Sequence, residues 1–209
     1  MPRITKIEPQ NKNPKRGSVF LDERFAFGLD EEVVYKYGLK AGQELEQKEI
    51  DKIIEAETKK GAKDAALKFL SYRMRSEKEV RDKLKKKEFA QSLIDEVIKD
   101  LKRVNLIDDN EFASAFVRDR ISNNPRGKIL LKQELWKKGI KKEIIEKALK
   151  EYFKDKDEEL TLAKELLQKR KKRYESLDEN VAKRRIMSFL LRRGFSYDIV
   201  KQVLRIEDE

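Results

Sequence analysis

Residues 80–101 read VRDKLKKKEFAQSLIDEVIKDL, and the spacing of apolar residues in this stretch recurs twice further along the chain. The second stretch begins at Leu131 and the third at Ile186, so the offsets are 51 and 55 residues. Self-similarity at a period of this size is typical of repeat proteins, in which neighbouring units bury one another's apolar faces. The pattern predicts a mainly α-helical protein, an elongated array of three tandem three-helix repeats.

Each stretch contains an apolar pair four residues apart, followed by a wider apolar stripe. Both features indicate helices that bury one face, and an apolar segment upstream predicts a further helix in each repeat. We expect Leu84, Leu135 and Leu190 to occupy equivalent core positions. The predicted repeats cover residues 62–107, 108–156 and 157–209.

Polar residues at the expected helix starts have capping-box spacing, as in Asp108 followed by Glu111 and in Ser76 followed by Glu79. Asp108, Asp109 and Glu111 also raise the question of a metal site. Metal sites built from oxygen ligands need several convergent groups, and capping already accounts for these residues, so no metal is expected.

Two glycines, Gly139 and Gly194, stand where the second helix of repeats two and three should end. A helix commonly ends there with a residue in the left-handed conformation. Glu88 stands at this position in the first repeat. We therefore expect the first repeat to have a different turn.

Residues 1–61 predict a separate, small α+β module. Three short segments, at 3–8, 18–22 and 24–29, have the alternation of strands, and helical patterns follow at 30–37 and about 47–60. The module is expected to join the helical array near Gly61.

The composition excludes several kinds of chemistry. The chain has no cysteine and no histidine, which removes disulfides, Cys/His zinc sites, thiol nucleophiles and Ser-His-Asp machinery. It has no Gly-rich phosphate loop and no carboxylate spacing that suggests a nuclease. Its start has no apolar signal region, and no apolar run approaches a membrane span. The sequence predicts a cytoplasmic protein that is not an enzyme and needs no cofactor.

The chain is basic, and its charge is unevenly distributed. It carries 51 Lys and Arg against 40 Asp and Glu, a formal net charge of +11. Residues 1–61 are neutral, so the whole excess lies in the helical region. Such a surface suits a polyanion such as nucleic acid, or an acidic protein groove. A merely solvated Lys/Glu-rich surface accounts for the charge equally well.

Basic residues also end the second helix of every repeat, and this recurrence suggests a row of charges that contact phosphates or an acidic groove wall. The alternative is that these cations complement the helix dipole. Trp136, beside Leu135, is either a partly exposed interface anchor or packed against the next repeat. The candidate partner-binding or DNA-binding residues are Lys85, Lys86, Lys87, Arg126, Lys128, Trp136, Lys137, Lys138, Arg192 and Arg193.

Residues 106–113 read LIDDNEFA, and FVRDR follows at 116–120. These two motifs resemble the most recognisable stretch of the RecX family of RecA regulators. Arg126-Gly127-Lys128, with QEL at 133–135 and KGI at 138–140, resembles its second-repeat signature, and RGFSY at 193–197 resembles the third. Phe20-Leu21-Asp22 and Gly38-Leu39 resemble an N-terminal extension found in some members.

The resemblance implies a protein that lies in the helical groove of RecA filaments on DNA. It implies inhibition of strand exchange, of coupled ATP hydrolysis and of coprotease activity, within homologous recombination, DNA repair and the SOS response. The implied partners are RecA and non-specific single- or double-stranded DNA, with the chain acting as a monomer away from membranes. The alternative is a sequence-independent DNA-binding helical protein without a recombinase partner, because three-helix modules resemble helix-turn-helix units.

Overall fold

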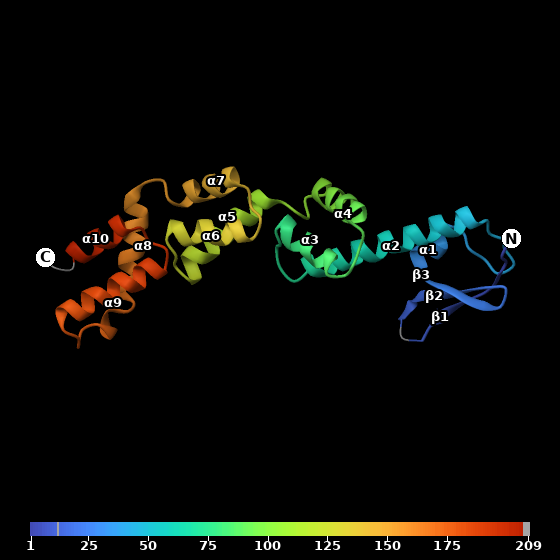
Figure 1. Ribbon diagram of the computed structural model, residues 1–209, viewed down its shortest axis with the longest axis horizontal. Helices are drawn as coiled ribbons and strands as arrows, with labels where there is room; N and C mark the ends of the chain where they lie inside the picture. The colour runs from blue at the N-terminus through green and yellow to red at the C-terminus, as the bar shows by residue number, and fades with distance from the viewer. Residues whose placement is uncertain (12, 207–209) are drawn as a thin grey trace. The chain divides into compact units, whose positions relative to one another are not determined.

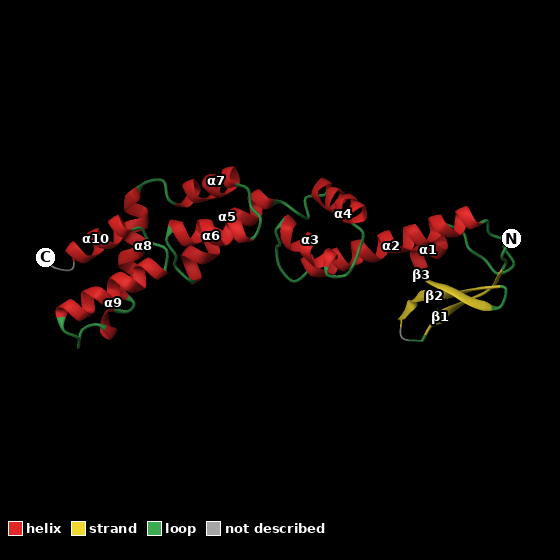
Figure 2. Cartoon of the chain, in the orientation of Figure 1, coloured by secondary structure: helices red, strands yellow, loops and turns green. Residues whose placement is uncertain are grey.

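The structure, a computed structural model, describes residues 1–11 and 13–206 and is mainly helical with one small sheet (Figures 1 and 2). It divides into two compact units. The first unit comprises residues 1–73 and 81–101, and the second comprises residues 74–80 together with the chain from residue 102 onward.

The N-terminal module is a three-stranded antiparallel sheet with two helices. Its strands β1, β2 and β3 are consecutive neighbours in the sheet, as expected where short turns connect alternating segments. The core contains Val19 and Leu29 from the strands, together with Val33 from α1 and Ile53 from α2. The elements are β1 Ile4–Gln10, β2 Asn13–Leu21, β3 Arg24–Asp30, α1 Glu31–Lys36 and α2 Gln47–Leu70.

Helix α2 runs through Gly61 without interruption, whereas the sequence suggested a joint there. Ala62 and Ala66, which follow the glycine, are fully buried, and Ile53, which precedes it, is only 1% exposed. Burial on both sides of Gly61 favours one continuous helix, even though glycine has low helix propensity. The N-terminal module and the first repeat therefore share a helix.

The described helices beyond α1 form three successive triples, as the repeat predicted. The first triple uses the end of α2 with α3 Glu77–Lys85 and α4 Gln91–Arg103. The second consists of α5 Asp109–Asn123, α6 Lys128–Lys137 and α7 Lys142–Tyr152. The third consists of α8 Lys156–Gln168, α9 Glu179–Arg192 and α10 Tyr197–Ile206, with a 3-10 turn, η1 Lys171–Arg173, between α8 and α9.

Leu84, Leu135 and Leu190 are all fully buried, which confirms their equivalence as core positions. The second and third triples share one continuous hydrophobic core, in which Leu135 and Leu190 lie together with residues such as Phe153 and Leu162. Removing either leucine would therefore leave a cavity that affects two repeats.

The expectation of a different turn in the first repeat is wrong. Glu88 has a φ of 62°, beside 79° for Gly139 and 85° for Gly194. The amide of the following residue donates to the carbonyl five positions earlier in all three repeats, from Phe89 to Leu84 at 3.4 Å in the first. This bonding closes the helix as in a Schellman motif, and it holds Glu88 in a backbone conformation that suits glycine better.

Candidate partner interface

The predicted row of basic residues separates into two classes. Lys85, Lys86, Lys87, Lys137 and Arg192 are exposed to solvent. Lys85 and Lys137 are the last residues of α3 and α6, and Arg192 is the last of α9, where cations complement the partial negative charge of the helix end. None of these five side chains forms an ion pair with a carboxylate among the described residues, although Arg192 donates a hydrogen bond to the Ser188 hydroxyl, so their charges are available to a partner.

Lys138 belongs to the second class, because it is half-buried and held by the protein itself. Its Nζ lies 3.0 Å from Glu79 Oε1 and 5.7 Å from the ring centroids of Phe112 and Phe116. An ammonium held between a carboxylate and two aromatic faces has a structural role.

Arg193 is also half-buried, and it hydrogen-bonds the side-chain oxygen of Asn124. Its guanidinium lies 5.5 Å from the ring centroid of Phe189. Arg193 therefore stabilises the link between the second and third repeats. Only Arg192 of the Arg192-Arg193 pair remains on the surface.

Arg126 and Lys128 are likewise paired within the chain. Arg126 forms an ion pair with Glu134, and burial, followed by the charges of Arg120 and Arg193, lowers the pKa of its guanidinium. Lys128 Nζ lies 3.6 Å from Glu159 Oε2. Both residues lie at the start of α6, where their pairing fixes the helix.

Within the second unit, the second helix of one repeat begins against the turn between the second and third helices of the next repeat. We call this contact a joint. It occurs twice, and the paired residues described above surround it. At the first joint, the Ser76 hydroxyl donates to the Lys138 carbonyl at 2.7 Å. At the second, the Gly127 amide donates to the Arg193 carbonyl at 2.9 Å.

An acidic side chain completes each joint. Asp109 accepts the Glu77 amide at 2.9 Å, and Glu159 accepts the Lys128 amide at 2.9 Å. In both cases the carboxylate comes from the first helix of the next repeat and caps the start of α3 or α6. An unpaired amide at a helix start is satisfied in this way, which accounts for the buried carboxylate of Glu159 and the half-buried carboxylate of Asp109.

The acidic turn at residues 108–111 acts as a helix cap, as expected. Asp108 accepts the amides of Asn110 and Glu111, and the first of these bonds is the main reason that its pKa is lowered. Burial raises the pKa of Asp109. Among the described residues, no group of three or more acidic side chains is placed to hold a metal ion.

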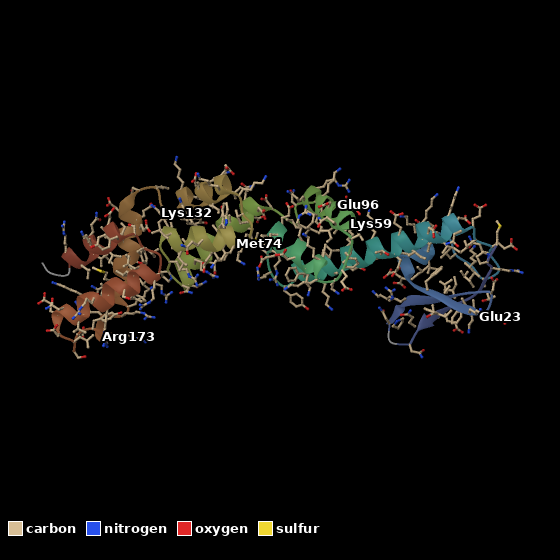
Figure 3. The ribbon with its side chains drawn as sticks, viewed as in Figure 1. Glu23, Lys59, Met74, Glu96, Lys132 and Arg173 are labelled. Atoms are coloured by element: carbon tan, nitrogen blue, oxygen red, sulfur yellow. The ribbon has the colours of Figure 1, made fainter. Side chains whose placement is uncertain are left out.

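Three arginines that sequence analysis missed line a hollow in the third repeat together with Arg192. Arg170, Arg184, Arg185 and Arg192 surround a volume of about 630 Å³, whose walls include Phe189. Within the described chain, no carboxylate lies at ion-pair distance from these four guanidiniums. We call this feature the arginine hollow. Arg173, labelled in Figure 3, belongs to the adjoining η1 turn.

A sequence signal for the hollow does exist. Residues 180–197 contain five arginines or lysines on and beside α9 and no acidic residue. Arg185 and Arg192 are seven apart and so lie on similar faces of α9. Arg170 comes from outside that helix, and no local pattern links it to them.

Trp136 is 66% exposed, so of the two interpretations the structure favours a surface residue over one packed against the next repeat. It borders a hollow between α6 and α7, lined also by Lys132, Lys137 and Ile145. Lys132 is labelled on α6 in Figure 3.

Four family models match successive parts of the chain. They are the regulatory protein RecX N-terminal domain at residues 2–46 and the first, second and third three-helix domains of RecX at residues 62–101, 108–149 and 157–204. The chain belongs to the RecX family.

Curated RecX relatives match along nearly the whole chain. Regulatory protein RecX of Bacillus licheniformis is 40% identical over 209 residues, which is all of this chain and 78% of that protein. Regulatory protein RecX of Clostridioides difficile is 37% identical over 96% of this chain and 93% of its own length.

Two solved RecX structures have the same fold. One crystal structure of regulatory protein RecX aligns over both complete chains, with a TM-score of 0.73 and 31% identity. RecX from Lactobacillus salivarius aligns with a TM-score of 0.65 and 33% identity over 73% of this chain and 98% of that one.

The motifs that carry the RecX resemblance lie mainly at the joints between repeats. Gly127 and Gly194 meet at the second joint, and Asp109 closes the first. This chain is therefore a regulatory protein by family, with signature residues that hold its repeats together. The described part of this RecX chain contains no helix both long and apolar enough to span a membrane.

Proposed function

We propose that this RecX-family chain binds RecA filaments on DNA, lies in their helical groove and inhibits strand exchange, coupled ATP hydrolysis and coprotease activity. It acts in the cytoplasm as a monomer, without a cofactor and without catalysing a reaction. Its place is in homologous recombination, DNA repair and the SOS response.

The arginine hollow is the observation that carries the proposal. Four guanidiniums that have no carboxylate partner among the described residues surround it, in contrast to Arg126, which pairs with Glu134. A guanidinium presents a fork of N–H donors that matches phosphate oxygens. When such cations neutralise the phosphates of a nucleic acid, the counterions bound to that nucleic acid are released, which favours binding. The hollow fits the phosphate backbone of filament-bound DNA.

A repeat architecture supports a filament partner over a single small ligand. Repeats with exposed basic residues at the ends of α3, α6 and α9 can each contact one element of a periodic target. Linked weak contacts of this kind add through effective concentration. The alternative function, sequence-independent DNA binding without a recombinase, uses the same cations, so it is separated by measuring affinity for DNA with and without RecA.

The proposal is tested with purified chain added to RecA-catalysed strand exchange and to DNA-dependent ATP hydrolysis by RecA. We expect inhibition of both, and tighter binding to RecA–DNA filaments than to the same DNA alone. Equal affinity for both substrates, with unimpaired strand exchange, would establish the alternative.

Arg184→Gln with Arg185→Gln is the matching variant, and Lys147→Gln with Lys150→Gln on the exposed face of α7 is its control. The arginine variant should bind filaments more weakly, with a slope of log affinity against log salt that is shallower by roughly 0.7–0.9 per lost phosphate contact. The lysine variant removes the same charge elsewhere. If both variants behave alike, the hollow has no special role in binding.

A further inference from the structure

Trp136 occupies a surface position that the fold does not require to be aromatic. Its equivalents in the first and third repeats are Lys85 and Leu191, which are also exposed. The core positions beside it are already filled, because Leu135 is fully buried. An indole that is 66% exposed contributes little to the core, and exposed Trp side chains are enriched at the centres of interfaces.

The indole borders a hollow of about 410 Å³ between α6 and α7, which we call the Trp136 pocket. Its wall consists almost entirely of apolar atoms, from Ile145 and the aliphatic stems of neighbouring side chains. A volume of this size accommodates one bulky apolar side chain. The lining residues are Lys132, Gln133, Trp136, Lys137, Lys142, Ile145 and Glu146.

The rim of the Trp136 pocket is positively charged. Lys132, Lys137 and Lys142 contribute three ammonium groups, against the single carboxylate of Glu146. None of the three lysines forms an ion pair with any carboxylate that the structure describes. Carboxylates of a ligand would therefore meet cations that no internal partner neutralises, and such complementarity steers association.

The positively charged rim could attract either a nucleic acid strand or an acidic protein segment, and the apolar wall distinguishes between them. A nucleobase has polar edges, and burying them against a wall that is almost entirely apolar costs free energy. A phenyl or isobutyl group loses no hydrogen bond on entering the same space. The pocket therefore favours a protein segment over a nucleic acid strand.

We propose that the Trp136 pocket binds an acidic segment of a partner protein, with one bulky apolar side chain inserted beside the indole and flanking carboxylates at Lys132, Lys137 and Lys142. This goes beyond the proposed function, because it assigns a protein-binding site that works in the absence of DNA. The arginine hollow then serves the nucleic acid, and the Trp136 pocket serves the protein.

The test uses the full chain, in which Trp136 is the single tryptophan and so reports on its own pocket. The probe is a short synthetic peptide of Asp, Glu and Gly residues with one central Phe. Adding it should shift the tryptophan emission to shorter wavelength, because the indole loses contact with water. A peptide with Ala in place of Phe should bind at least about tenfold more weakly, since it buries no aromatic ring.

Two variants complete the test, and both should fold because they alter exposed side chains. Lys132→Gln with Lys142→Gln should weaken peptide binding several-fold, whereas the control Lys147→Gln with Lys150→Gln, on α7 but outside the pocket, should leave it unchanged. Trp136→Ala should abolish binding of a fluorescently labelled peptide, with circular dichroism confirming the fold.

Three outcomes would overturn the proposal. Equal affinity of the Phe and Ala peptides would make the contact purely electrostatic. Equal loss of binding in the two lysine variants would place the peptide elsewhere. A larger shift of the tryptophan emission with single-stranded oligothymidylate than with the peptide, at the same ionic strength, would assign the pocket to nucleic acid. Binding of the Phe peptide with both predicted losses supports it, whether or not the chain inhibits RecA.

Discussion

At the scale of single residues, the turn that ends the second helix is the same in all three repeats, although only two of them have glycine there. Glu88 adopts a φ of 62° at the place of Gly139 and Gly194. The sequence could not reveal this, because a pattern shows which residue suits a turn and not which turn the surrounding packing imposes. Leu84 and Phe89 are tied by a backbone bond across it.

Replacing this residue tests the idea that packing holds it in a strained conformation. A left-handed non-glycine residue costs roughly 1–2 kcal/mol, and the extra freedom of an unfolded glycine offsets about 0.5–1 kcal/mol. Glu88→Gly should therefore raise the free energy of unfolding by about 0.5–1 kcal/mol, measured by urea denaturation. The control Glu88→Gln keeps the strain and should change little. A less stable glycine variant would mean that Glu88 makes a compensating contact.

Asp109 gives a second prediction at this scale. Burial raises the pKa of its carboxyl in the folded protein, so the folded state holds a proton more tightly than the unfolded state does. Its contribution to stability is therefore greatest at low pH and is lost as the pH rises from the unfolded value of 3.8 through the raised folded value. Asp109→Asn keeps an oxygen for the Glu77 amide and carries no charge.

We expect the stability of Asp109→Asn, relative to the wild type, to increase as the pH rises through this window. The quantity to measure is the difference in stability between Asp109→Asn and the wild type at each pH. Asp108 has a lowered pKa, so in both proteins it makes stability rise with pH, and this contribution cancels in the difference. Thermal denaturation from acid to neutral pH provides the curves. A difference that stays constant across the window would show that Asp109 titrates as in the unfolded chain.

At the scale of helices, the periodicity of apolar residues predicted the elements, whereas the contacts between repeats could not be predicted. Leu135 and Leu190 are buried as their spacing indicated, because burial follows directly from helical geometry. The Lys138–Glu79 pair joins residues 59 positions apart, and no local pattern connects them. For the same reason, the sequence did not indicate that Lys138 and Arg126 pair with carboxylates within the chain.

Glycine substitutions test the second joint between repeats. A methyl group on Gly127 would overlap the Gly194 carbonyl and the Phe195 amide, which belong to backbone and cannot rotate away. Gly127→Ala should destabilise the protein by about 1–3 kcal/mol, as overpacking does. Its control is Gly61→Ala, where an added Cβ meets no atom within 4 Å in the middle of α2.

The same chemical change at Gly61 should stabilise the protein by about 0.5–1 kcal/mol, because alanine is the better helix former. Urea denaturation should therefore show that the free energy of unfolding falls in Gly127→Ala and rises in Gly61→Ala, each relative to the wild type. Equal shifts would mean either that the second joint opens at little cost or that α2 does not continue through Gly61.

At the scale of the whole molecule, composition alone does not separate basic residues that pair within the fold from those that stay exposed and that we propose bind a partner. The net charge of +11 indicated a basic surface, and family membership agrees with a regulatory role. The sequence placed Lys137 with Lys138, and Arg192 with Arg193, as equivalent neighbours. In the structure one member of each pair faces solvent and the other is held by the joint between repeats.

The contrast between the exposed and the half-buried member of each basic pair leads to the last prediction. Lys137→Gln with Arg192→Gln should weaken binding to RecA–DNA filaments and leave the unfolding transition in place, because exposed charges contribute little to stability, typically about 0–1 kcal/mol for an ion pair.

Lys138→Gln with Arg193→Gln removes the same formal charge one residue further on. It should lower the unfolding transition, because Glu79 and Asn124 each lose one partner in half-buried surroundings. Filament binding by anisotropy and thermal denaturation of each double variant provide the two measurements. If the exposed pair also governs stability, or if its loss leaves filament binding intact, the surface cations do not form the partner interface.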